Sequence, residues 1–378
     1  MRGMTEELHS YIQAINAETP WLLPLCFAMF GACVGSFLNV VIYRLPRGLS
    51  VNEPSRSFCP DCRQEIPWYL NIPIFSWLML RGRSACCNKS IPVRYCLVEA
   101  ATAAMFAAIA WYFGADPLPT QILLCVWGAT MLAVLCIDLE QMIVLPVLTN
   151  TAAIAGLLAV LFAPWLVEPQ ALSASEGLMW SLCGAASGYL LLKLVALLGK
   201  RLFGQKSTTY DHPQTWRMYQ DGDDITLSIG EDTYSWSELF MESSNRVRLH
   251  GATISASGGD TPGTISFSAE NARLENGSLI SLEEHDNLSG TCTGMSCSRE
   301  AMGSGDALIA MAIGALCGWQ GILFALVAGS FIGLGQAISA RIGRGVPMPF
   351  GPAFIAGACI YLFFGNTITQ YYLSCFEY

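Results

Sequence analysis

Long apolar runs alternate with short polar segments over most of this 378-residue chain. Each run is close to the length of about 20 residues that an α-helix needs to cross a bilayer. The pattern predicts eight membrane-spanning helices, at residues 21–43, 96–113, 119–137, 145–166, 177–199, 305–319, 321–340 and 350–366. The boundary between the sixth and seventh runs, at CGWQG, is the least distinct, and we expect tails at 1–20 and 367–378.

The first apolar run is expected to remain in the protein. The residues before it, MRGMTEELHS, are acidic rather than basic, and no small-residue cleavage site follows the run. Both features differ from those of a removable signal peptide.

Basic residues gather in alternate loops. The segment 44–95 is rich in Arg and Lys, and the loop 341–349 contains Arg341 and Arg344, whereas the turns at 114–118 and 167–176 contain neither residue type. Because loops with excess Lys and Arg stay in the cytoplasm, we expect both termini on the opposite side. The predicted cytoplasmic segments are 44–95, 138–144, 200–302 and 341–349.

One long segment, 205–300, differs from everything around it. It is polar and contains short alternating runs such as DITLSIG and GTISFSAENARL, separated by Gly, Asp and Asn. These are signals for strands and turns, so we predict an inserted, β-rich cytoplasmic domain. The last part, DNLSGTCTGMSCSREAMGSG (286–305), is expected to be a flexible link.

The composition supports this architecture. With 53% hydrophobic and 13% charged residues, the chain is predicted to be an all-α polytopic membrane protein whose surroundings are the lipid bilayer. A net charge of −9 and the scattering of basic residues over loops argue against a nucleic-acid partner. Many of the 15 cysteines lie in apolar runs, where we interpret most of them as packing residues.

Two aspartates stand at the edges of predicted helices. Asp138 ends the third run, and Asp306 begins the sixth run after Gly303 and Gly305. The predicted topology puts both at the cytoplasmic face, where a carboxylate at a membrane edge is most often functional. The simpler alternative is a carboxylate that only interacts with the dipole of its helix.

Two adjacent carboxylates suit peptide hydrolysis. They cannot both ionise when poorly solvated, so one keeps a proton and the other does not. The ionised group can take a proton from an attacking water, while the protonated one stabilises the carbonyl oxygen. This chemistry needs no metal, cofactor or nucleophilic side chain.

The motifs around these aspartates resemble those of the type IV prepilin leader peptidases, which are GxGD-type intramembrane aspartyl proteases and in many cases also N-methyltransferases. The matching stretches follow the order of that family and cover almost everything except 1–20 and 205–300. They are GSFLNVVIYRLP (35–46), CPDC (59–62), residues 75–100, IDLEQMIVLP (137–146), GSGDALIAMAIGALCGWQ (303–320) and VPMPFGPAFIAGACIYLF (346–363).

The resemblance implies an activity and its partners. Asp138 and Asp306 match the catalytic pair, and Gly303 and Gly305 match the glycines of the GxGD motif. The implied substrate is the short basic leader of a prepilin or type II secretion pseudopilin, cut at the cytoplasmic face of the bacterial inner membrane. Many members also methylate the new N-terminus with S-adenosylmethionine.

The chain departs from the family pattern at several positions. Val147 stands where a second Asp often follows the proline, and Leu308 stands where Lys is common. These changes could alter the pair of carboxylates without removing it. The insertion at 205–300 is outside the common plan, and its partner is unknown.

Four cysteines in the segment 44–95 are candidate metal ligands. Cys59 and Cys62 form one C-x-x-C pair, but the second pair of the family is altered to RGRSACCN, with Ser84 in the first place and Cys86 and Cys87 following. In a reducing compartment such a set favours structural zinc over a disulfide. The alternative is a reduced loop without metal.

Three further polar residues have two interpretations each. Asn39 could form a hydrogen bond between helices or simply pack. The resemblance makes Glu99 a candidate site residue, whereas its place near a helix start suits the helix dipole equally well. Arg94 is most simply explained as a positive anchor on the cytoplasmic side.

The sequence therefore predicts about eight membrane helices, with helices two to five in 96–200 and six to eight in 303–366. The function that follows is cleavage of prepilin-like leaders. The alternatives are a GxGD peptidase with other membrane substrates, a non-catalytic scaffold of a pilus or secretion system, and a solute transporter with a proton relay. The transporter is disfavoured because both aspartates lie at one face and not at mid-membrane.

Overall fold

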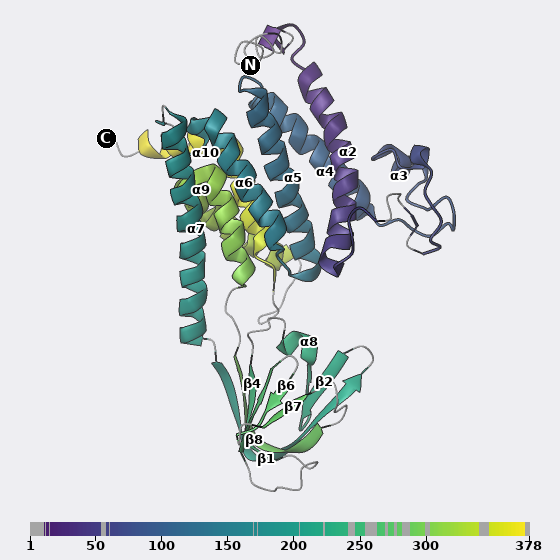
Figure 1. Ribbon diagram of the computed structural model, residues 1–378, viewed down its shortest axis with the longest axis vertical. Helices are drawn as coiled ribbons and strands as arrows, with labels where there is room; N and C mark the ends of the chain where they lie inside the picture. Colours follow the sequence, from purple (N-terminus) through teal and green to yellow (C-terminus); the bar gives the residue numbers. More distant parts are fainter. Residues whose placement is uncertain are drawn as a thin grey trace. The chain divides into compact units, whose positions relative to one another are not determined.

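The computed structural model divides the chain into two compact units (Figure 1). The first contains residues 1–192 and 304–378, and the second contains 193–303. The structure describes residues 11–374 apart from 12, 15, 54–57, 60, 169, 172, 204, 222–223, 241–245, 254–262, 269–270, 276–277, 282–287, 299–302 and 340–347. The predicted basic loop at 341–349 thus lies mostly outside the described residues.

Seven long helices match the predicted apolar runs. They are α2 (Leu22–Arg44), α4 (Val93–Tyr112), α5 (Leu118–Gln141), α6 (Pro146–Phe162), α7 (Ala174–Phe203), α9 (Ser304–Ser339) and α10 (Gly351–Ser374). Among the described residues, five helices are long and apolar enough to cross a bilayer, namely α2, α4, α5, α7 and α9. The apolar parts of α6 and α10 are shorter. The prediction of a multi-helix membrane protein is confirmed at this level, and the count of eight spans is not.

Helix α9 is interrupted at the place where the sequence pattern was least distinct. Gly318 lies inside CGWQG and has a non-helical backbone, with φ 66° and ψ −172°. Only glycine adopts this positive φ without strain. A Cβ at this position would lie 2.9 Å from the carbonyl oxygen of Val167. The sixth and seventh predicted runs are therefore two helical halves joined at Gly318.

The first half of α9 is enclosed by other helices. Gly184 on α7 faces Gly314 so closely that a Cβ on either would collide with the other's backbone. The Ser181 hydroxyl of α7 donates to the Ala315 carbonyl, and Trp127 Nε1 of α5 donates to the Ala312 carbonyl at 3.1 Å. Small residues and polar bonds are the usual means of joining helices in lipid. These contacts hold the half of α9 that contains Asp306 in its first turn.

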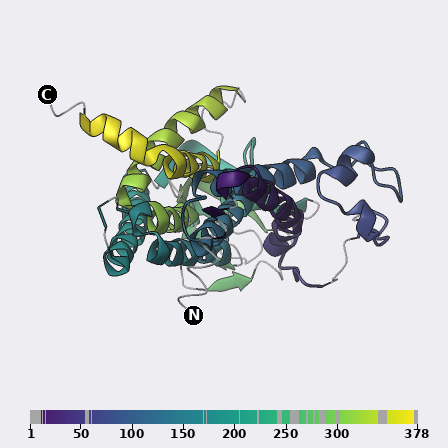
Figure 2. The same ribbon diagram turned by 90° about the horizontal axis from the view of Figure 1, so that it is seen from above.

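The segment between α2 and α4 is a loop with little regular structure, and it lies to one side of the helices (Figure 2). It contains η1 (Leu45–Arg47), η2 (Trp68–Leu70) and the short helix α3 (Phe75–Met79). We call residues 45–92 the Cys loop.

The second unit is an antiparallel eight-stranded sheet. Its strands are β1 (Gln205–Asp221), β2 (Asp224–Ile229), β3 (Asp232–Ser235), β4 (Val247–Ala252), β5 (Gly263–Phe267), β6 (Asn271–Arg273), β7 (Leu279–Ser281) and β8 (Leu288–Ser298). They are ordered β3-β2-β1-β8-β4-β5-β6-β7. With the short helix α8 (Trp236–Leu239), they enclose a core that includes Trp216, Trp236 and Phe267. The predicted β-rich insertion is confirmed.

Two details of the sequence prediction are wrong. The expected flexible link at 286–305 contains β8, a central strand that pairs with both β1 and β4. β8 consists mainly of Ser, Thr, Gly and Cys, so its composition resembles that of a linker, and the strands that pair with it lie far away in sequence. The expected C-terminal tail at 367–378 is helical as far as Ser374, because α10 continues beyond its apolar part.

Candidate active site

Asp138 lies in the last turn of α5. The helix ends at Gln141, and Met142 follows in the left-handed conformation with φ 54° while its N–H bonds to the Asp138 carbonyl. Asp138 therefore lies near the end of the helix. Its side chain is nevertheless buried, with 6% of its surface exposed. The predicted position at a helix edge is confirmed.

Asp306 lies in the first turn of α9, as the sequence predicted. Gly303 is exposed and directly precedes the helix. Gly305 permits a close approach, because a Cβ there would lie 2.5 Å from the Cβ of Val144. Val144 belongs to the short connection that leads from α5 to α6. The glycine before Asp306 therefore lets α9 contact the segment that follows Asp138.

The structure brings the two aspartates together. The carboxyl groups of Asp138 and Asp306 lie close enough for their charges to interact. They come from the end of α5 and the start of α9, which are separated by more than a hundred residues in sequence. Two carboxyl groups that interact in a poorly solvated place tend not to ionise together, so one can act as a base while the other keeps its proton.

The start of a third helix, α10, lies against Asp138. The sequence pattern did not predict this contact. The N–H of Gly351, the first residue of α10, donates to the Asp138 carboxylate. A Cβ on Gly351 would collide with Asp138 Oδ2. The glycine in MPFGPAF was visible in the sequence, but nothing local showed that its backbone meets α5. Gly351 thus orients one aspartate from a different helix.

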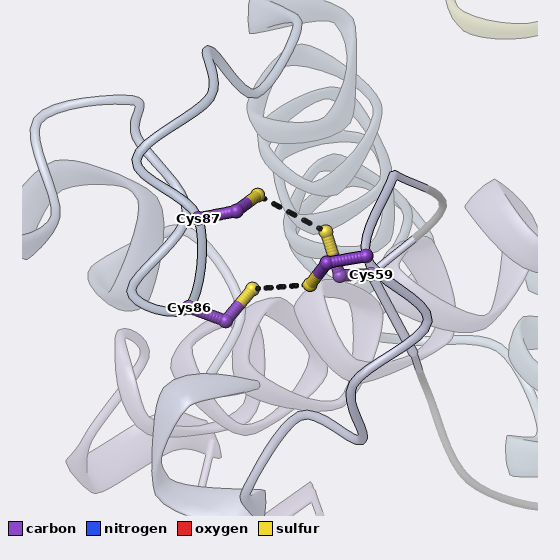
Figure 3. Close-up of side chains that lie close together, drawn as sticks. Cys59, Cys86 and Cys87 are labelled. Atoms are coloured by element: carbon purple, nitrogen blue, oxygen red, sulfur yellow. Dashed lines mark hydrogen bonds between the residues drawn. The ribbon is translucent and has the colours of Figure 1, made fainter.

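The four cysteines of the Cys loop also come together. Their sulfur atoms all lie within 4.8 Å of one another, and the group consists of Cys59, Cys62, Cys86 and Cys87. The sulfur atoms of Cys59 and Cys87 are 3.7 Å apart, and those of Cys62 and Cys86 are 3.3 Å apart. Figure 3 shows Cys86 and Cys87 reaching from one side of the loop toward the turn that holds Cys59.

This spacing fits a tetrahedral metal ion. Zinc–sulfur bonds of 2.3 Å place neighbouring thiolates about 3.8 Å apart, close to the distance between Cys59 and Cys87. The backbone N–H of Cys62, helped by Asp61 and the neighbouring thiols, lowers the pKa of the Cys59 thiol to about 7 against the opposing effect of burial. The pKa of the Cys62 thiol is raised to about 12 against the effect of the Gln64 N–H, because Cys62 hydrogen-bonds the Cys86 thiol and lies beside Cys59. A thiolate is the form that binds metal. The donor set and its geometry therefore fit zinc.

The three other polar residues have structural roles. Asn39 Nδ2 of α2 donates to the Tyr95 carbonyl of α4 at 3.1 Å, so it does join two helices. Glu99 is buried and accepts a 2.6 Å hydrogen bond from the N–H of Ile74 in the Cys loop. Arg94 pairs with Glu140 in the last turn of α5, two residues beyond Asp138. Arg94 is therefore more than a membrane-surface anchor.

Comparisons with known proteins agree with the resemblance seen in the sequence. Residues 29–113 match the bacterial peptidase A24 N-terminal domain, and residues 279–338 match the type IV leader peptidase family. Together the two regions include the Cys loop and Asp306. They indicate a membrane-bound leader peptidase as the class of protein.

Curated relatives named "Prepilin leader peptidase/N-methyltransferase" are similar over different shares of the chain. A Klebsiella pneumoniae protein is 36% identical over 51% of this chain and 82% of its own length. An Aeromonas hydrophila protein is 26% identical over 94% of this chain and 96% of its own length. A Pseudomonas putida protein is 34% identical over 48% of this chain, and the chain covers 66% of that relative. No solved structure matches the chain significantly.

These findings show the family. The chain belongs to the type IV leader peptidase family, as the sequence predicted.

Proposed function

We propose that this protein is an intramembrane aspartyl endopeptidase that removes the leader peptide of type IV prepilins or type II secretion pseudopilins. The observation that carries the proposal is the meeting of Asp138 and Asp306 from the ends of two apolar helices, in a chain of the leader peptidase family. A pair of carboxyl groups at this position has the chemistry for peptide hydrolysis.

In the proposed reaction the two aspartates share the roles of base and acid. The ionised carboxylate takes a proton from water as the water attacks the scissile carbonyl carbon. The protonated partner hydrogen-bonds the carbonyl oxygen as negative charge develops there, and it later supplies the proton for the leaving amine. Gly351 N–H holds Asp138 in the orientation for this exchange. Gly305 lets Asp306 come within reach of it.

We also propose the finer points of location. The Cys loop and the second unit are cytoplasmic, because alternate loops of the chain are basic. The helical halves on either side of Gly318, together with α6 and α10, complete eight membrane segments in the bacterial inner membrane. In this arrangement the two aspartates would lie near the cytoplasmic face, where a leader precedes the substrate's hydrophobic helix.

A structural zinc ion is the second part of the proposal. Cys59, Cys62, Cys86 and Cys87 would hold it, and it would stabilise a loop that has little apolar core. Four thiolates fill the coordination of zinc, so this ion would take no part in peptide cleavage.

Methyl transfer is a further activity to test. The relatives carry N-methyltransferase in their name, and the matched N-terminal domain at 29–113 spans the Cys loop. We propose that the new N-terminus of the pilin accepts a methyl group from S-adenosylmethionine.

The test is an assay of leader removal in membranes that lack other prepilin peptidases. The wild type is compared with Asp138→Asn and Asp306→Asn, using the mobility of a prepilin on gels and the mass of its N-terminus. Either substitution should reduce cleavage by at least about a hundredfold, because each removes a proton-transfer group. The N-terminal mass also shows whether a methyl group of about 14 Da is added, as expected for N-methylation.

Asp211→Asn is the matched control, since it makes the same chemical change at an exposed position on β1 of the second unit. It should cleave like the wild type. Full cleavage by either of the two site variants at equal expression would refute the assignment of the catalytic pair. A folded, inserted wild type that leaves several prepilins uncut would favour a scaffold role or other membrane substrates.

A further inference from the structure

The first turn of the Cys loop has a compact hydrogen-bond pattern. The Cys59 N–H donates to the Gln64 carbonyl at 2.9 Å, and the Arg63 N–H donates to the Cys59 carbonyl at 2.8 Å. Arg63 has a positive φ of 58°. An isolated antiparallel bridge between Phe58 and Glu65 closes the turn.

The second turn repeats this pattern position by position. The Ser84 N–H donates to the Lys89 carbonyl at 2.8 Å, and the Asn88 N–H donates to the Ser84 carbonyl at 3.0 Å. Asn88 also has a φ of 58°. An isolated antiparallel bridge between Arg83 and Ser90 closes this turn. The described residues of the two turns therefore share the same hydrogen bonds, positive φ and closing bridge.

The correspondence identifies which side chain stands in each ligand position. The first turn presents a cysteine at its first and fourth places, Cys59 and Cys62. The equivalent places of the second turn are occupied by Ser84 and Cys87. The second turn has therefore lost the thiol at its first place. Zinc prefers thiolates, and a neutral hydroxyl is a weak ligand for it.

Two contacts show how the chain compensates. Cys86 stands at the third place of the second turn, and its sulfur lies 3.3 Å from that of Cys62. It therefore enters the cluster from a place that no ligand uses in the first turn. Ser84 Oγ lies 3.0 Å from Cys87 Sγ, within the range of a hydrogen bond to sulfur. A metal-bound thiolate only accepts hydrogen bonds, so the hydroxyl would be the donor if Cys87 binds a metal ion.

We propose that the second turn binds zinc through Cys86 and Cys87, and that Ser84 acts as a hydrogen-bond donor to the Cys87 thiolate and not as a ligand. The proposal rests on the structural zinc of the proposed function. Compared with the first turn, the second turn would use a ligand at its third place instead of its first, with the same backbone hydrogen bonds. Hydrogen bonds to a ligating group typically contribute about 10- to 100-fold in metal affinity.

The experiment uses the full-length protein in detergent, depleted of metal and then titrated with cobalt or zinc. Cobalt reports the number of bound thiolates through its thiolate charge-transfer band, and competition with a chelating dye gives the zinc affinity. The wild type should bind one ion with four thiolates. Cys86→Ser should show three thiolates and a zinc affinity at least about tenfold lower.

Two further variants separate the roles of the serine and the cysteine. Ser84→Ala should keep the four-thiolate band but lower the zinc affinity by about tenfold, because the thiolate loses a donor. The double variant Ser84→Cys/Cys86→Ser should regain four thiolates, since it restores the first place of the turn. Cys26→Ser, which changes an exposed cysteine of α2, is the matched control and should bind cobalt like the wild type.

The outcomes are distinguishable. A wild type that binds no metal would remove the zinc site of the proposed function and this inference with it. Metal binding with an unchanged four-thiolate band in Cys86→Ser would leave the zinc site standing and overturn the assignment of Cys86. An unchanged affinity in Ser84→Ala would overturn the donor role of the serine. Leader cleavage by each variant shows that the helical unit has folded.

Discussion

The aspartate pair and the cysteine cluster are assembled by different means. The aspartates are contributed by α5 and α9, helices that are distant in sequence, and α10 orients one of them. The cysteines are contributed by two local turns, each held by hydrogen bonds between residues four or five places apart. The aspartate site therefore depends on how closely helices pack, whereas the cysteine site depends on turn geometry and, in our proposal, on a bound metal ion.

This contrast predicts that small changes in packing affect the two sites unequally. Gly305 and Gly351 lie against the side chains of Val144 and Asp138 so closely that an added side chain would collide with them. The turns of the Cys loop keep their shape through their own backbone. Four experiments test the comparison.

The largest effect is expected from Gly351→Ala. The added methyl group would collide with Asp138 Oδ2, and displacement of a catalytic group by about 1 Å can reduce the rate about a hundredfold. Gly335→Ala is the matched control, since a Cβ there meets nothing within 4 Å. Initial rates of leader removal at equal protein amounts give the comparison. Equal rates for the two variants would show that Gly351 does not orient Asp138.

Removal of zinc should affect the Cys loop and leave the aspartate pair unchanged. After chelation we expect the Cys loop, residues 45–92, to become sensitive to limited proteolysis, because the proposed ion would link its two turns. Leader cleavage should stay within about twofold, since a four-thiolate zinc has no open position for chemistry. The measurements are mass spectrometry of the fragments and the cleavage rate in the same sample. If cleavage is lost in proportion to zinc, the two sites are coupled and the comparison fails.

Glu99→Ala tests the contact that links the Cys loop to α4. Its carboxylate accepts the Ile74 N–H at 2.6 Å, and hydrogen bonds to charged groups contribute about 1.5–3 kcal/mol. We expect faster proteolysis of the Cys loop in Glu99→Ala, with zinc still bound. Glu99→Gln keeps an acceptor oxygen, so its rate of proteolysis should lie between those of the alanine variant and the wild type. Identical proteolysis of all three proteins would show that the contact does not hold the loop.

The smallest effect is expected from Arg94→Gln. The ion pair with Glu140 is partly exposed, and such pairs contribute about 1 kcal/mol or less. We predict a decrease in melting temperature of a few degrees at most and a cleavage rate within about threefold of the wild type. The charge swap Arg94→Glu/Glu140→Arg should recover part of the loss. A hundredfold decrease in cleavage would instead place Arg94 in the active site.

Local patterns were sufficient for much of the fold. Apolar runs predicted the helices, and alternating polar runs predicted the β-rich second unit, because both periodicities are imposed by the backbone. The same logic failed for β8, whose Ser, Thr and Gly residues resemble a linker. A central strand is defined by its pairing with β1 and β4, and those partners lie far away in sequence.

The aspartate pair and the cysteine cluster also combine features that the sequence predicted with features that only the structure shows. The sequence alone determined that Asp138 and Asp306 stand at helix ends, that four cysteines lie in one loop, and that the chain resembles the leader peptidases. Only the tertiary structure decided that Gly351 lies against Asp138, that Glu99 holds the Cys loop, and that Cys86 lies beside Cys62. The physical reason is distance along the chain. Helix ends and turn types follow from neighbouring residues, whereas contacts between helices depend on packing that no local pattern encodes.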